Sequence, residues 1–529
     1  MRAAPAAAAA VAQRAAAAEL RDAMDVAARA RGAAEPAALA RVLAASAAHS
    51  AALHSTALPA EQRARYMWLR DGERPSPLLC KLMRPPKASR QVGALRARGG
   101  GLTTDGHAMA STMARFFAGI STALPPDPPA LDAVLAAVRS QASIQPELAA
   151  AAGAPSVSVA EVRRSLRQSR PGAAPGPDGI PIELWRRGGA ALPRLLARVY
   201  SAVGHTGGVP RGFLAGDVAP IFKKGDPAEP TNYRPITLLP AHHRQRSKKK
   251  KVLFMHLLPH LLASNRAAGD GDTAVVAAFL DFSKAYDTVS RPFLYAVMEA
   301  MGAGDGLLRW TRAILTGTTA SATVNGFTSA AQPYHAGVRQ GCPVAPALFL
   351  FAAEALVRHL HGCPSVGIDI TRGVRVFCVQ FADDTLPLLR QLTPACVQAF
   401  LAFMHVFQMA SRLALNPPKS QLLALGDAVP PDGVLPESVC GLAVVTEAAS
   451  LGAVVVAGGE PQPDWEELLD QVALKYDKLA RLPLSAFGRA SAAAAYGVSR
   501  LLHRATMHAV PQWVFDRLHR ISKRLVDAG

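Results

Sequence analysis

Short apolar runs alternate with loops rich in Gly, Pro and Asp between about residue 170 and residue 460. The run 273–281 is apolar, starts after turn residues and ends on an acid, which predicts a buried strand. Ser290 can cap a helix that carries Pro292 in its first turn and ends at Gly302, so a helix is predicted between them. This central region is therefore expected to mix strands with helices.

The same reading continues toward the C-terminus. Apolar spacing predicts a helix over 344–361, and alternation predicts a hairpin over 373–390 whose tip is 382–385. Pro387 follows this tip. Because proline has no amide hydrogen to donate to a neighbouring strand, the strand that contains Pro387 is expected at a sheet edge.

The two ends of the chain are predicted to be helical. Residues 1–60 are rich in alanine, the strongest helix former, and a targeting peptide is the alternative to a plain helical lead-in. A stiff proline-rich linker is expected at 125–129, followed by two short helices within 130–170 that separate near Pro155. Helical spacing beyond residue 460 is carried by Trp465, Leu468, Leu469 and Val472.

Composition narrows the class of protein. The chain has 529 residues, which favours two to four structural units, and its 50% hydrophobic content excludes a generally disordered chain. Six cysteines without a CxxC pair indicate a reduced compartment inside the cell rather than a disulfide scaffold. No uninterrupted apolar run of about 18 residues occurs, so no membrane span is expected. The net charge of +19 favours a polyanion such as nucleic acid, although an arginine-rich genome composition would have the same effect.

Three acids carry the candidate chemistry. Asp281 ends the predicted strand, and Asp383 and Asp384 stand together at the predicted hairpin tip, where apolar flanks indicate burial. Adjacent buried carboxylates repel each other and lose hydration, and a divalent cation removes that cost. Carboxylate oxygens suit Mg²⁺, and two such ions can clamp an in-line phosphoryl displacement. Ordinary turn chemistry is the alternative explanation for an Asp-Asp pair.

Around these acids the sequence resembles reverse transcriptases, in the wording of non-LTR (LINE-type) retrotransposons. The first acid lies in Leu280-Asp-Phe-Ser-Lys-Ala-Tyr-Asp-Thr-Val, and the pair lies in Phe381-Ala-Asp-Asp. The other matching stretches, in chain order, are 72–76 (a weak match), 175–181, 219–227, 232–239, 337–349, 415–420, 451–452 and 484–489.

The resemblance implies an α+β right-hand polymerase fold with fingers, palm and thumb behind a helical N-terminal extension. The implied division is 1–60 for an Ala-rich lead-in, 61–160 for the extension, 161–445 for fingers and palm, and 446–529 for primer grip and thumb. The implied activity is RNA-directed DNA synthesis from dNTPs, with an RNA template and a DNA primer at a nicked genomic target. The expected location is nuclear, cytoplasmic or both.

Residue roles also follow from the resemblance. Asp281 and Asp383 would hold two Mg²⁺ ions, and Asp384 would assist. Tyr286 would pack under the sugar and exclude a 2′-hydroxyl by its volume, with a core aromatic as the alternative. Lys419 would donate a proton to departing pyrophosphate, with a surface lysine as the alternative.

The remaining implied roles concern nucleotide and primer. Arg234, together with Lys223 or Lys224, would reach the incoming triphosphate, for which a guanidinium is well shaped; a solvated face is the alternative for the lysines. Gln340 and Gly341 would approach the nucleotide and template. The primer terminus would be supported by Leu451 and Gly452.

The sequence departs from the family between Leu239 and Asp281. A longer fingers segment is expected there, and the basic run 242–251 stands in its place. A deletion or a wrongly spliced gene would explain this, whereas an RNA-gripping or nuclear-import segment is the alternative. Two rival functions therefore stay open, a non-catalytic RNA-binding remnant of such an element and a reverse transcriptase of the group II intron type.

Overall fold

The computed structural model describes residues 91–97, 99–169, 171–210, 212–240, 262, 264–269, 271–370, 373–381, 384–450, 453–457, 464–482, 484–505 and 508–528, with scattered positions between 15 and 48. The chain divides into two compact units, of which one is Ser89–Pro461 and the other contains Gln462–Gly529. Predictions for Asp383, Leu451, Gly452, the stretch 72–76 and the basic run 242–251 lie outside the described residues.

The centre of the larger unit is a six-stranded sheet with the strand order β11-β12-β5-β13-β15-β14. Neighbours pair antiparallel except β13 and β15, which run parallel. The predicted strand near 273–281 is confirmed as β5. The strand bounds are β5 Ala274–Phe279, β11 Cys378–Phe381, β12 Asp384–Leu389, β13 Gln421–Gly426, β14 Ser438–Val439 and β15 Leu442–Val445.

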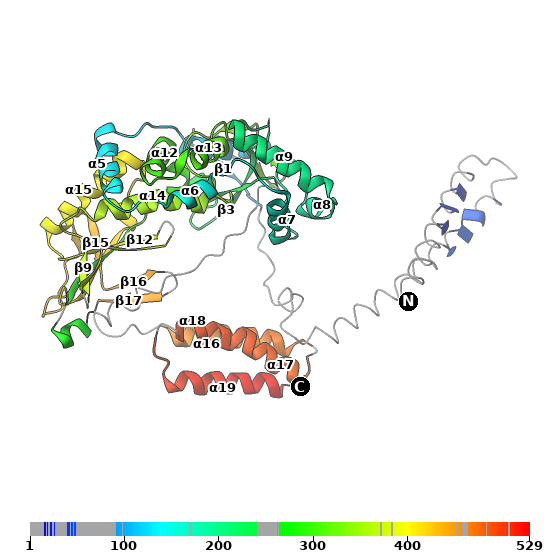
Figure 1. Ribbon diagram of the computed structural model, residues 1–529. Coiled ribbons are helices and arrows are strands. Elements are labelled where there is room, and N and C mark those ends of the chain that lie inside the picture. The colour runs from blue at the N-terminus through cyan, green and yellow to red at the C-terminus, as the bar shows by residue number, and fades with distance from the viewer. Residues whose placement is uncertain are drawn as a thin grey trace. The chain divides into compact units, whose positions relative to one another are not determined.

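Both faces of this sheet are buried. Val276 and Ala278 of β5 belong to a large core under a layer of helices, whereas Val275 and Ala277 belong to a second core on the opposite face. The alternation follows from the two-residue repeat of a strand. The helices of the first core lie together in Figure 1, and their bounds are α5 Pro128–Arg139, α12 Arg291–Ala300, α13 Gly304–Leu315, α14 Ala345–Leu360 and α15 Pro394–Ser411.

A second sheet has the order β4-β3-β6-β7, and β8 also pairs with β6. Its apolar residues pack with α4 Gly106–Ile120 in a core of their own. The strands are β3 Ala215–Phe222, β4 Tyr233–Leu238, β6 Thr319–Val324, β7 Phe327–Thr328 and β8 Gln332–Pro333. Three small hairpins are β1 Leu95–Arg96 with β2 Leu102–Thr103, β9 Ile368–Ile370 with β10 Val374–Val376, and β16 Glu447–Ser450 with β17 Ala453–Val456. The remaining helices named in this unit are α6 Pro146–Ala152, α7 Val159–Gln168, α8 Ile182–Arg187, α9 Ala191–Thr206 and α11 Ala285–Thr288.

Helix boundaries follow local chemistry. Ser290 caps α12 by accepting a hydrogen bond from the amide of Phe293, as predicted, and the helix at 344–361 is confirmed as α14. The linker prediction at 125–129 is wrong in part, because Pro128 and Pro129 form the first turn of α5, where proline is tolerated. The described chain has three helices rather than two near 130–170, since Pro146 begins α6.

The hairpin is confirmed over β11 and β12, but 374–376 pairs with β9 instead. The edge prediction for Pro387 is wrong, because β12 lies between β11 and β5. The strand accommodates Pro387 because the hydrogen-bonded pairing between β12 and β5 is interrupted at that residue. Pairing of β12 with β5 is formed at Leu388 and Leu389 and again at Thr385, and it skips the residues between.

The other unit is helical, as predicted for the region beyond residue 460. Its buried residues include Trp465, Leu468, Leu469 and Val472, the four residues with helical spacing. The elements are α16 Trp465–Ala480, α17 Ala486–Ala493, a π-helical turn at Ala494–Val498, α18 Ser499–Ala505 and α19 Gln512–Asp527. Across the part of the chain that the structure describes, no helix is both long and apolar enough to cross a bilayer.

Candidate active site

The end of β5 brings two of the three predicted acids into register. The amide of Leu280 donates to the carbonyl of Thr385 at 3.1 Å, so the antiparallel pairing of β5 with β12 continues past Phe279. One further step in this register places Asp281 opposite Asp384. Side chains directly opposite on antiparallel strands stand on the same face with Cβ atoms about 5 Å apart.

A loop after α15 supports Asp281. The side-chain amide of Asn416 donates to Asp281 Oδ2 at 2.9 Å, and the amide of Asp281 donates to Ser420 Oγ at 3.2 Å. Lys419 Nζ lies 4.0 Å from the same carboxylate oxygen. Asn416 was not among the predicted site residues, although it lies inside the matched stretch 415–420.

These groups fit a hard divalent cation. The burial expected for the acid pair is wrong for Asp384, which is exposed. The side chain of Asp281 is 47% exposed, so both carboxylates are accessible for binding an ion with its waters. Among the residues that the structure describes, no three His, Cys, Asp or Glu side chains gather as a metal-binding group. The predicted set includes Asp383, which lies outside those residues.

Cations from the second sheet converge on the acids. Lys223 follows β3, and its amide donates to the carbonyl of Asn232 at 2.9 Å, next to the start of β4. Burial lowers the pKa of Lys223, as do the positive charges of Arg234 and Lys419, whereas Asp281 and Asp287 act in the opposite direction. Lys223 and Lys419 therefore lie within electrostatic reach of Asp281, and Lys223 and Arg234 lie within reach of Asp287. Lys224 is exposed in the turn that follows.

A fourth acid, Asp287, was missed by the sequence analysis. Its Oδ2 accepts a hydrogen bond from Gln340 Nε2 at 3.1 Å. Burial raises the pKa of Asp287 to about 7, although Lys284, Lys223 and Arg234 favour its ionised form. The only signal for Asp287 in the sequence is its place in the matched stretch 280–289.

Tyr286 and the loop that contains Gln340 form one packed unit. The ring of Tyr286 stacks on Phe349 with centroids 4.4 Å apart, and its carbonyl accepts from the amide of Val338. Gly341 has a φ of +105°, and a Cβ there would meet the carbonyl oxygen of Thr237 at 2.3 Å. The close approach that requires glycine is thus to the backbone of β4.

Arg291, which was also not predicted, stabilises the loop that contains Gln340 through hydrogen bonds to the residues that lead into it. Its buried guanidinium donates to the carbonyls of Gly337, Tyr334 and Ala336 at 2.9–3.1 Å, and also to Leu315 and Thr318. Burial lowers the pKa of Arg291 to about 10. Thr318 Oγ1 and Ser121 Oγ also donate to the carbonyls of Tyr334 and Ala336. The five hydrogen bonds from this one buried side chain therefore help to fix the path of the chain into 337–341.

Comparisons with known proteins agree with this geometry. Residues 221–454 match the family described as "Reverse transcriptase (RNA-dependent DNA polymerase)", whose members use divalent metal ions. The chain is 27% identical over 282 residues to a retrovirus-related Pol polyprotein from type-1 retrotransposable element R2 of Popillia japonica, covering 49% of this chain and 38% of that protein. It is 23% identical over 300 residues to the transposon TX1 uncharacterized 149 kDa protein of Xenopus laevis, covering 52% and 23%. The chain thus spans less than half the length of these curated relatives.

Solved structures give weaker likenesses. The RNA-dependent RNA polymerase of a human picorbirnavirus has a TM-score of 0.37 and 11% identity, covering 88% of this chain and 84% of that one. Telomerase from Candida tropicalis has a TM-score of 0.30 and 10% identity, covering 66% and 62%. Scores this low do not establish a shared fold, so the assignment depends on the family match and on the sheet that carries the acids. Residues 221–454 are thus similar to reverse transcriptases, the curated relatives that match are retrotransposon proteins, and the matched stretch contains β5, β11, β12 and β13 of the six-stranded sheet.

Proposed function

We propose that this chain is an RNA-directed DNA polymerase that extends a primer 3′-hydroxyl with dNTPs on an RNA template. The observation that carries the proposal is the pairing of Leu280 with Thr385, whose register continues to Asp281 and Asp384. Lys419 and Lys223 near Asp281 add to it. Oxygen ligands next to phosphate-binding cations are what phosphoryl transfer requires.

Two Mg²⁺ ions held by Asp281, Asp383 and Asp384 would activate the primer hydroxyl and neutralise the triphosphate. The primer 3′-hydroxyl would release its proton to water as its oxygen forms a bond to the α-phosphorus, the bond from that phosphorus to the bridging oxygen would break, and pyrophosphate would leave. Lys223 and Arg234 would bind the triphosphate, and Lys419 would supply a proton to the pyrophosphate.

The other residues would select and position. Tyr286 would limit the space beside the sugar, and Gln340 and Gly341 would border the nucleotide. Leu451 and Gly452 would support the primer end. The relatives matched are retrotransposon proteins, which favours this reading over the group II intron type.

The test is primer extension by the purified full chain on poly(rA)/oligo(dT) with dTTP and Mg²⁺. Extension that EDTA abolishes and that excess Mg²⁺ restores is expected. If the wild-type chain binds the duplex but extends no primer, the proposal fails in favour of the RNA-binding remnant.

A further inference from the structure

Residues 91–97 lie outside the residues matched by the family, yet they pack against the second sheet, which contains β3, β4 and β6. Leu95 is completely buried, in the same core as Tyr233 of β4 and Met113 of α4. Asn325 also fixes the segment through hydrogen bonds in both directions with the backbone of Val92, at 2.8 and 2.9 Å. Burial and these bonds give the segment a defined position.

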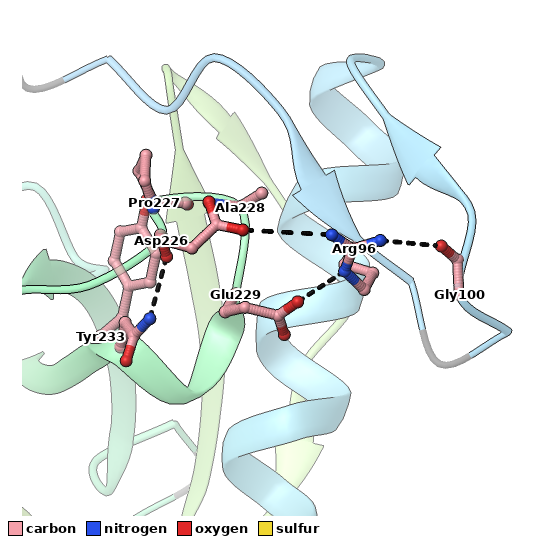
Figure 2. A network of polar contacts seen from close by, with 8 residues as sticks. Arg96, Gly100, Asp226, Pro227, Ala228, Glu229 and Tyr233 are labelled. Atoms are coloured by element: carbon pink, nitrogen blue, oxygen red, sulfur yellow. Dashed lines mark hydrogen bonds and ion pairs between the residues drawn. The ribbon is translucent and has the colours of Figure 1, made fainter.

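From that position Arg96 reaches the turn 223–232. Its amide donates to the carbonyl of Ala228 at 2.8 Å, and its Nε donates to Glu229 Oε1 at 2.5 Å. A third contact is an ion pair with Asp226 at 4.0 Å, and Nη1 donates to the carbonyl of Gly100 at 3.3 Å. Figure 2 shows Arg96 between the loop that contains Gly100 and this turn.

Hydrogen bonds within the turn connect the residues that Arg96 contacts to Lys223 and to Tyr233, which precedes Arg234. The side-chain amide of Asn232 donates to the carbonyl of Asp226 at 3.0 Å, and the hydroxyl of Tyr233 donates to the carbonyl of Pro227 at 2.7 Å. The carbonyl of Asn232 in turn accepts from the amide of Lys223. Lys223 and Arg234 therefore flank this turn, at the open end of the paired strands β3 and β4.

We infer that Arg96 is a positioning residue, which holds the turn 223–232 so that Lys223 and Arg234 face the triphosphate. The inference rests on the proposed function. Arg96 is 42% and Glu229 35% exposed in their side chains, so the ion pair adds little to overall stability. Its effect falls on the geometry of the turn.

The test compares Arg96→Ala with wild type in two measurements, steady-state primer extension and hydrogen–deuterium exchange of the 223–233 amides. We expect the KM for dNTP to rise about threefold to fivefold with kcat changed less than about twofold, as the loss of an exposed ion pair allows. Exchange in the turn should rise as well. The charge-reversed pair Arg96→Glu with Glu229→Arg should recover both values. Arg115→Ala, which removes an exposed arginine of α4, is the matched control and should change neither.

Unchanged exchange in Arg96→Ala would overturn the inference, as would faster exchange with an unchanged KM. Failure of the charge-reversed pair to recover the KM would also count against it. An inactive wild-type chain would refute the proposed function instead, and the exchange measurement would still decide whether Arg96 holds the turn.

Discussion

The acids and the cations of the candidate site are held by different kinds of structure. Asp281 follows a strand whose residues Val275–Ala278 are completely buried and which pairs on both sides. Lys223 and Arg234 stand at the open end of β3 and β4, where Ile221 and Phe222 are 51% and 44% exposed. A backbone ladder in a core fixes position firmly, whereas an exposed turn depends on polar contacts that each contribute little. Under the proposed function, changes at Asp281 should therefore stop the reaction, and changes at the open ends of β3 and β4 should weaken nucleotide binding.

The largest effect is expected for Asp281→Asn. It removes the charge that would hold both ions while Asn416 and Ser420 keep a polar partner, so kcat should fall by about 10³-fold or more. Duplex binding should stay within about twofold. Asp432→Asn, in an exposed loop, is the control with the same chemical change. Retained synthesis in Asp281→Asn would remove the metal site from the end of β5.

Arg234→Ala should have a smaller effect of a different kind. Loss of charge-assisted hydrogen bonds to a triphosphate corresponds to roughly 1.5–3 kcal/mol, so the KM for dNTP should rise about 10-fold to 100-fold. Because Arg234 lies on the exposed side of β4, kcat should change little. Arg234→Lys keeps the charge and should lie between the two. A fall in kcat at an unchanged KM would contradict the assignment of Arg234 to nucleotide binding rather than to the chemical step.

Tyr286→Val tests whether a residue that follows β5 can determine the choice between deoxyribonucleotides and ribonucleotides without determining kcat. Its ring stacks on Phe349, so the position of the ring is fixed. Removing the ring should raise kcat/KM for ribonucleotides about 10-fold relative to dNTPs, because discrimination by volume is modest. Tyr286→Phe keeps the ring and should discriminate like wild type. Unchanged selectivity in Tyr286→Val would return this residue to a purely core role.

Local chemistry explains which elements the sequence analysis predicted. The strand β5, the helix α12 with its cap and the helix α14 depend on residues within one short stretch, so pattern and capping were enough. The position of Pro387 was misjudged because strand order is a property of the whole sheet. No local pattern shows that β12 lies between β11 and β5.

The same distinction applies to the site. Asp281 and Asp384 could be selected from motif and flank, since each has a recognisable neighbourhood. Asp287, Arg291 and Arg96 could not, because their partners lie far away in sequence, at Gln340, Tyr334 and Glu229. The roles of the buried groups Asp287 and Arg291 and of the exposed Arg96 can be recognised only once the fold shows which residues contact them.

Asp287 follows β5 and lies near the cations Lys223 and Arg234, so it is close to both groups compared above. Replacing it should have the smallest effect of the substitutions considered, and that effect should be on stability. Burial raises its pKa from an ordinary 3.8 to about 7 in the folded chain. Between these pH values the folded state holds a proton that the unfolded state has released, so the free energy of unfolding falls as pH rises from about 4 to about 7. Asp287→Asn still accepts from Gln340 but cannot ionise. Its Tm relative to wild type should therefore be about 2 °C or more higher at pH 8 than at pH 5. Asp432→Asn should show no such trend, and a parallel pH dependence of wild type and Asp287→Asn would mean that Asp287 ionises as freely as an exposed acid.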